Sequence, residues 1–319
     1  MLKLNSTFLY FFSIILGCLI FFNYSQVFGW INADYEPVYV GYSQTIFHPD
    51  HMARVMYWGE SILLPIISNL VGASKSKTSF FFLCGFIYLL LFPIFSYFAL
   101  EKLKSPPRAL FFILLLGISF LIDGGGSPDS LIILLLGIAA LSNNFLLIFA
   151  SIALSCLAHF SLTFVAIVGF VPLIYFSPFN NKNSALKTIG IMFLALILGR
   201  CMLELWFWKF DYLHTNGRIQ YVIDLGFEFF KLNYLKNPAE FWLAPNIPFL
   251  LIFIGVALYF VYLKQFSFCF AALFGLFLAY IAMFFTLDGQ RIFSVAISAS
   301  WIYFLLAFMS PLNVSSLKE

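Results

Sequence analysis

The sequence MYWGESILLPIISNLVG, residues 56–72, decides how the rest of this chain is arranged relative to a membrane. Its apolar core runs from Ile62 to Val71 and contains Pro65 and Asn69. A helix needs about 20 apolar residues to cross a bilayer, so a core of about ten residues predicts a helix that lies at the membrane surface. If this segment did cross, every later connection would change sides.

A membrane is expected because 62% of the 319 residues are hydrophobic and only 10% are charged. These fractions lie well beyond those of an ordinary soluble domain. Apolar runs recur along the whole chain, and no polar stretch is long enough to bury a core of its own. The composition therefore predicts an all-α integral membrane protein with one polytopic domain, residues 1–319. The net charge of +3 is small and dispersed, which argues against a nucleic-acid partner.

The apolar runs predict about ten transmembrane helices, with a range of roughly nine to twelve. The first run is interpreted as a retained span, because it is longer than the apolar part of a signal peptide and lacks a clear small-residue cleavage site. Two long outer loops are expected, one at 30–78 with a juxtamembrane helix and one at 208–246. The candidate spans are residues 8–29, 79–100, 107–122, 128–142, 144–158, 160–177, 187–207, 247–263, 266–286 and 290–309.

The distribution of Lys and Arg predicts which side of the membrane each loop occupies. Short loops rich in these residues mark the cytoplasmic side. With the 56–72 segment on the surface, the connections 101–108 and 177–187 and Lys264 share the side of the N-terminus, which is therefore predicted to be cytoplasmic. Two nearby lysines at 75 and 77 fall on the outer side and count against this assignment.

Two carboxylates stand just beyond the first apolar run, in the stretch NADYEPVYVGY at 32–42. Asp34 and Glu36 would lie near the membrane surface, where a carboxylate can deprotonate a hydroxyl group or hold a divalent cation. The simpler interpretation is that acids are tolerated in an outer loop. Arg54 accompanies the acids of this loop, which are Asp34, Glu36, Asp50 and Glu60.

Two further polar positions interrupt apolar runs on the outer side. The sequence GGGSPD at 124–129 is a turn by composition, and it places Asp129 at the membrane surface, where it could join Asp34 around a shared site. His159 stands inside LSCLAHFSLTF. It is either a buried histidine at a join between two helices or a group that transfers protons or binds a ligand.

Three arginines are candidates for binding a lipid phosphate from the outer side. Arg200 and Glu204 are four residues apart and share a helix face near the outer end of a span. One interpretation is a structural ion pair, and the other is that the guanidinium group binds phosphate. Arg218 and Arg291 are alternative phosphate-binding residues.

Taken in order, these features resemble the GT-C class of multi-span membrane glycosyltransferases. They are the acidic pair followed by Tyr39, Arg54 ahead of LLPIISNLVG at 63–72, the basic connection EKLKSPPR, and an outer turn with Asp129 before the next span. In that class the Leu-Pro segment is a juxtamembrane helix. The stretch AHFSLTFVAIVGFVPL at 158–173 is also similar to one in bacterial exopolysaccharide and O-antigen polymerases.

The resemblance covers roughly residues 8–175 and implies an enzyme of surface glycan or polysaccharide assembly. It would move a sugar from a polyprenyl-phosphate or polyprenyl-diphosphate donor to an acceptor on the outer face. Asp34 matches the catalytic acid of the class, with Glu36 beside it, although the two are spaced as Asp-Tyr-Glu rather than adjacent. If the reaction uses a divalent cation, Mg²⁺ or Mn²⁺, then Asp34 and Asp129 would hold it.

The implied setting is the inner membrane of a bacterium, with a glycan or lipid-linked acceptor meeting the donor on the periplasmic face. Two other classes of function stay open. A transporter or flippase for lipid-linked sugars would place charged or broken-helix elements near the bilayer midplane and would show internal repeats. A non-catalytic membrane subunit would use the outer loops to bind a partner. No convincing repeat relates the two halves of the sequence.

Overall fold

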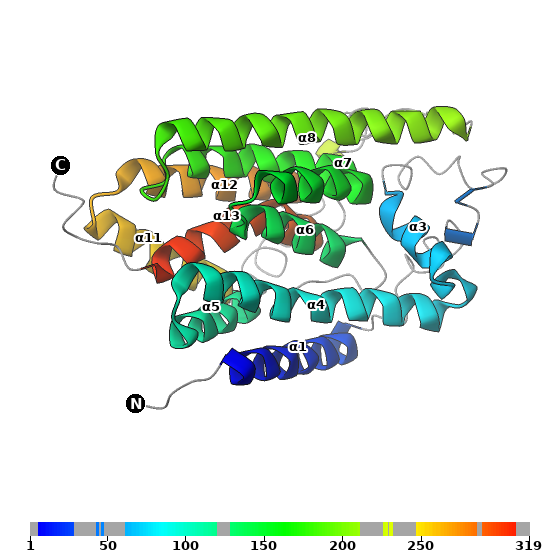
Figure 1. Ribbon diagram of the computed structural model, residues 1–319, viewed down its shortest axis with the longest axis horizontal. Coiled ribbons are helices and arrows are strands. Elements are labelled where there is room, and N and C mark those ends of the chain that lie inside the picture. Colours follow the sequence, from blue (N-terminus) through cyan, green and yellow to red (C-terminus); the bar gives the residue numbers. More distant parts are fainter. Residues whose placement is uncertain are drawn as a thin grey trace.

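The structure, a computed structural model, describes residues 6–28, 43–44, 46–47, 61–119, 128–210, 226–228, 230–231, 247–285 and 289–310. These residues form helices and short connections, and none of them is in a strand (Figure 1). The predicted all-α class is therefore confirmed for the described part of the chain. The elements are α1 (Ser6–Phe28), α3 (Leu63–Leu70), the 3-10 turn η2 (Ala73–Lys75), α4 (Lys77–Leu103), α5 (Pro106–Ser119), α6 (Asp129–Leu141), α7 (Phe145–Tyr175), α8 (Lys182–Lys209), α11 (Ile247–Tyr262), α12 (Phe266–Phe284) and α13 (Gly289–Met309).

The described helices have the apolar character of a membrane protein. Five of them, α4, α7, α8, α12 and α13, are long and apolar enough to cross a bilayer. Shorter apolar helices are α5, α6, α11 and the part of α1 that runs from Ser6 to Ile20. Membrane character is thus established for the described residues, while the number of ten spans stays a prediction.

The helix α7 has 31 residues in total, but the chain reverses direction at His159, so neither arm has that full length. That residue has φ −171° and ψ 103°, which are extended values inside the helix. The hydroxyl groups of Ser155 and Thr163 are hydrogen-bonded at 2.8 Å, although eight residues rise about 12 Å along a straight helix. Ile148 and Ile174, from opposite ends of α7, line one cavity. Therefore α7 is a hairpin of two antiparallel arms.

The arms of α7 coincide with the separate segments expected at 144–158 and 160–177, and both are short. The neighbouring helix α6 has 13 residues and rises about 20 Å, against about 30 Å for the hydrocarbon core of a bilayer. By contrast, α4 has 27 residues and α8 has 28, so each rises about 40 Å. The bundle thus combines half-length and full-length helices (Figure 1).

The short helix α3 answers the question raised by the 56–72 segment. It has eight residues and rises about 12 Å, which is too short to cross the hydrocarbon core. Leu70 and Val71, where it ends, are 72% and 63% exposed, as expected for a helix that rests on a membrane surface. Residues 56–60 lie outside the described part of the chain. Residues 61–76 therefore do not form a span.

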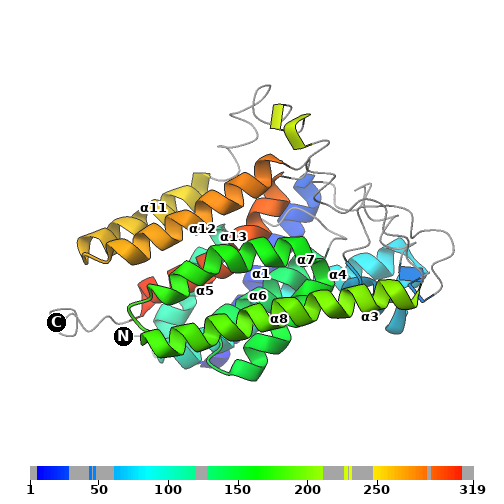
Figure 2. The ribbon, with the colours of Figure 1, turned by 90° about the horizontal axis from the view of Figure 1, so that it is seen from above.

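The connections between helices gather at two ends of the bundle (Figures 1 and 2). One end, called the Lys102 end, holds the α4–α5, α6–α7, α7–α8 and α11–α12 connections and the last turn of α13. The opposite end, called the Asp129 end, holds α3, the start of α6, the reversal in α7 and the start of α13. The described charged residues near the Lys102 end are Glu101, Lys102, Lys104, Arg108, Lys182, Lys187 and Lys264. The opposite end also carries described Lys and Arg residues, such as Lys75, Lys77 and Lys209, so the cytoplasmic side predicted for these loops stays a prediction.

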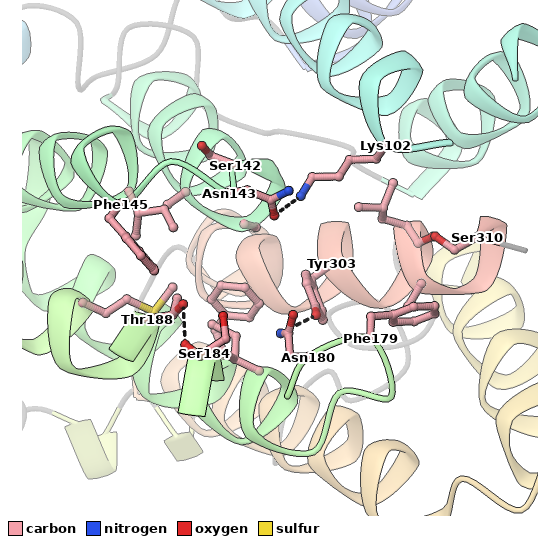
Figure 3. A pocket seen from close by; sticks show the side chains of 18 residues that line it. Lys102, Ser142, Asn143, Phe145, Phe179, Asn180, Ser184, Thr188, Tyr303 and Ser310 are labelled. Atoms are coloured by element: carbon pink, nitrogen blue, oxygen red, sulfur yellow. Dashed lines mark hydrogen bonds between the residues drawn. The ribbon is translucent and has the colours of Figure 1, made fainter. Parts of the chain in front are cut away.

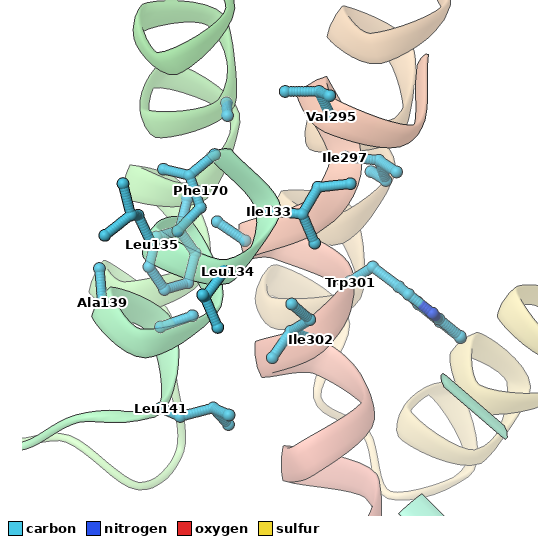
Figure 4. Close-up of a cluster of buried hydrophobic side chains, with 14 of the residues drawn as sticks. Ile133, Leu134, Leu135, Ala139, Leu141, Phe170, Val295, Ile297, Trp301 and Ile302 are labelled. Atoms are coloured by element: carbon cyan, nitrogen blue, oxygen red, sulfur yellow. The ribbon is translucent and has the colours of Figure 1, made fainter. Parts of the chain in front are cut away.

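The centre of the bundle is α13, which packs against α6 and α7 (Figure 4). In the apolar stretch of 18 residues within α13, 89% of the residues are buried inside the protein, compared with 28% in the corresponding stretch of α8. Therefore α13 is central and α8 faces outward.

Small residues allow α7 and α12 to pack closely. A Cβ atom on Gly169 of α7 would lie 3.3 Å from the Cα atom of Gly275 of α12. Trp301 is fully buried, and its indole N–H donates to Ser119 Oγ at 2.9 Å.

Candidate functional site

Asp129 and Arg291 form a buried ion pair at the Asp129 end. The distance between Asp129 Oδ2 and Arg291 Nε is 2.8 Å, and the two residues are 0% and 5% exposed. Asp129 is the first residue of α6, and Arg291 lies in the first turn of α13. The N-terminal end of a helix favours a carboxylate, and the guanidinium group adds to that effect. The pair therefore fixes the beginnings of two central helices relative to each other.

This pairing bears on the roles expected for the two residues. From the sequence, Asp129 could join Asp34 and Arg291 could bind a phosphate; the structure adds that Asp129 and Arg291 contact each other, and both expectations stay predictions. The sequence contained one signal for the pair, since opposite charges stand at the outer starts of two apolar spans. It gave no way to choose α13 over the other helices as the neighbour of α6.

His159 is buried at the reversal of α7, with 2% of its surface exposed. The break in the helix releases the carbonyl oxygen of Leu157, which accepts a hydrogen bond from the backbone N–H of Ile62 at 2.9 Å. This bond ties the start of α3 to the turn of the hairpin. The placement of His159 agrees with the expectation of a buried histidine at a join between two helices. A role of His159 in proton transfer or ligand binding stays a prediction.

Arg200 lies beside this turn, on α8. Its guanidinium group forms an ion pair with Glu204 on the same helix and sits over the ring of Phe160, with 5.0 Å between Cζ and the ring centroid. The side chains of Arg200 and Glu204 are 36% and 42% exposed. The structural ion pair is therefore present, and it coexists with a guanidinium group that a ligand can reach. A carboxylate and an aromatic face are both favourable neighbours for arginine.

Four predicted site residues, Asp34, Glu36, Arg54 and Arg218, lie outside the described residues. Within the described part of the chain, no group of three or more His, Cys, Asp or Glu side chains could hold a metal ion. One carboxylate oxygen of Asp129, Oδ2, is paired with Arg291. A cation held jointly by Asp34 and Asp129 stays a prediction, because Asp34 lies outside the described residues.

The described residues of the Asp129 end can supply positive charge and fixed geometry. Arg200 offers several N–H donors in a planar fork that suits a phosphate group. The ion pair joins the starts of α6 and α13, and the backbone hydrogen bond from Ile62 to Leu157 ties the start of α3 to the α7 hairpin. Searches against known proteins add nothing further, because no family model, no curated protein and no solved structure matches the chain.

Proposed function

We propose that this chain is a GT-C-type membrane glycosyltransferase that acts at the Asp129 end. The donor is a sugar on a polyprenyl phosphate or diphosphate, and the acceptor belongs to a glycan assembled at the extracytoplasmic face of a bacterial inner membrane. The observation that carries the proposal is the buried Asp129–Arg291 pair, with Arg200 at the same end of the bundle. Ionisable side chains within apolar helices are costly and mark functional sites in membrane proteins.

The proposed reaction exchanges one bond at the anomeric carbon of the sugar. An acceptor hydroxyl oxygen forms a bond to that carbon, the bond from the carbon to the lipid phosphate oxygen breaks, and the hydroxyl proton passes to the Asp34 carboxylate. Glu36 is two residues from Asp34 in the sequence, in the segment between α1 and α3. The negative charge that develops on the departing phosphate requires a positive group nearby.

Arg200 is the best candidate for that positive group among the described residues. Its side chain is 36% exposed and is held by Glu204 and by the ring of Phe160. Arg291 is only 5% exposed and faces Asp129, so its role is to position α6 and α13. Arg54 and Arg218 are proposed as additional donor contacts on the strength of the sequence.

One observation favours a different class of function, a flippase for lipid-linked sugars. The reversal of α7 at buried His159 produces a broken helix inside the bundle. Broken helices at membrane depth line the substrate sites of many transporters. A flippase needs no base in the first outer loop, so the two proposals differ in what they require of Asp34.

The test is glycan output in the native host for the wild type, a deletion, Asp34→Asn and Asp50→Asn. Asp50 lies in the same loop and loses the same charge, so it controls for loop electrostatics. The transferase proposal predicts that the deletion and Asp34→Asn lose the glycan and accumulate polyprenyl-linked sugar, while Asp50→Asn behaves as wild type. Normal glycan from an Asp34→Asn protein present at wild-type level would refute it.

A further inference from the structure

A cavity of about 360 Å³ lies at the Lys102 end, and Lys102 is among its lining residues (Figure 3). Residues from α4, α6, α7, α8 and α13 line it, together with the α6–α7 and α7–α8 connections. Its volume equals that of roughly twelve water molecules and falls within the range of small-molecule sites. We propose that this cavity binds a phosphate-bearing lipid, with the phosphate group beside Lys102 and the aliphatic chain against the inner wall.

The mouth of the cavity presents hydrogen-bond donors and one positive charge. Lys102 Nζ donates to the side-chain oxygen of Asn143, and Asn180 Nδ2 donates to the hydroxyl oxygen of Tyr303 at 3.0 Å (Figure 3). Ser184 lies in the first turn of α8, whose N-terminal end favours an anion. The described lining contains a lysine and neither Asp nor Glu. These groups suit a phosphate and disfavour a cation.

The inner wall of the cavity includes apolar as well as polar side chains. Ile148, Phe170 and Met192 are among the apolar residues that line it, and each of them is buried. At the mouth, Phe145 and Phe179 are each 42% exposed, and the neighbouring Leu146 is 75% exposed. An aliphatic chain can therefore run from the cavity along an apolar surface of the bundle. This continuity favours a lipid over a free phosphate ion.

The proposal does not depend on the transferase proposal, because the two sites lie at opposite ends of the bundle and share no residue. Lys104 supplies a matched control, since it is an exposed lysine at the same end that does not line the cavity. Replacing either lysine with Gln changes the net charge equally. Only Lys102→Gln removes a donor from the cavity.

The experiment measures binding to the purified full chain in neutral maltoside micelles by native mass spectrometry. The probes are dioctanoyl phosphatidylglycerol, dioctanoylglycerol and inorganic phosphate. We expect Lys102→Gln to weaken phosphatidylglycerol binding about tenfold, the loss of one charge-assisted hydrogen bond, while Lys102→Arg retains it and Lys104→Gln leaves it near wild type. Gel filtration of each variant verifies that the fold is retained.

The three probes distinguish the source of the phosphate. Tighter binding of phosphatidylglycerol than of inorganic phosphate would identify a lipid, and equal binding of both would identify a phosphate-ion site with the same residues. Two results would overturn the proposal. One is an equal loss of binding in Lys102→Gln and Lys104→Gln, and the other is dioctanoylglycerol binding as tightly as phosphatidylglycerol.

Discussion

Breaking the Asp129–Arg291 pair on one side should destabilise the protein far more than removing both partners. Asp129→Leu removes the carboxylate that faces the buried Arg291 guanidinium group. Arg291→Met removes the guanidinium group that faces the buried Asp129 carboxylate. The loss of one partner from a buried pair costs about 3–5 kcal/mol, whereas replacing both with apolar residues is often neutral. At about 2 °C per kcal/mol, each single variant should melt about 6–10 °C below wild type.

The assay is thermal unfolding of the two single variants, the double variant and the wild type, followed by tryptophan fluorescence in maltoside micelles. One scan rate is used throughout because such transitions are often irreversible. The double variant should melt within about 2 °C of wild type. If the melting temperature of the double variant were lowered by the sum of the two single losses, Asp129 and Arg291 would not be coupled, and this prediction would be wrong.

Two further predictions concern helix packing and topology. A Cβ atom at Gly199 would lie 2.5 Å from Cys156 Cβ, so Gly199→Ala should lower the free energy of unfolding by about 1–3 kcal/mol. A Cβ atom at Gly190, on the same helix, would meet nothing within 4 Å, so Gly190→Ala should be neutral or slightly stabilising. The same melting assay compares the two variants. In spheroplasts, an impermeant maleimide should label Lys75→Cys from outside and Arg108→Cys only after permeabilisation. Labelling of Arg108→Cys from outside would reverse the proposed sidedness.

Most helix positions could be predicted from the sequence, because apolar runs of a given length have few alternatives. His159 interrupts one such run, and the structure puts the break at that residue. Likewise, the short apolar core at 62–71 predicted a surface helix, and α3 has eight residues. Local length and composition suffice for both results, since neither depends on which helices are neighbours.

Features that depend on helix neighbours could not be predicted. Asp129 and Arg291 meet because α6 packs against α13, and no pattern within either helix indicates this. The cavity beside Lys102 was missed for a related reason. Its lining comes from several separated segments, and its polar residues, such as Asn180 in a connection and Tyr303 within an apolar helix, form no recognisable motif in the sequence. The expected base, Asp34, lies outside the described residues, so its partners stay a prediction.

The proposed transferase breaks the bond between a sugar and its polyprenyl carrier. This can be measured with purified protein reconstituted with the lipid extract of the deletion strain, which retains donor and acceptor, by following the release of polyprenyl phosphate or diphosphate by mass spectrometry. We expect release by the wild type and a rate about 10²–10⁴ times lower with Asp34→Asn. Movement of the sugar-linked lipid across the bilayer by the wild type, with no release, would show that the chain is a transporter and not a transferase.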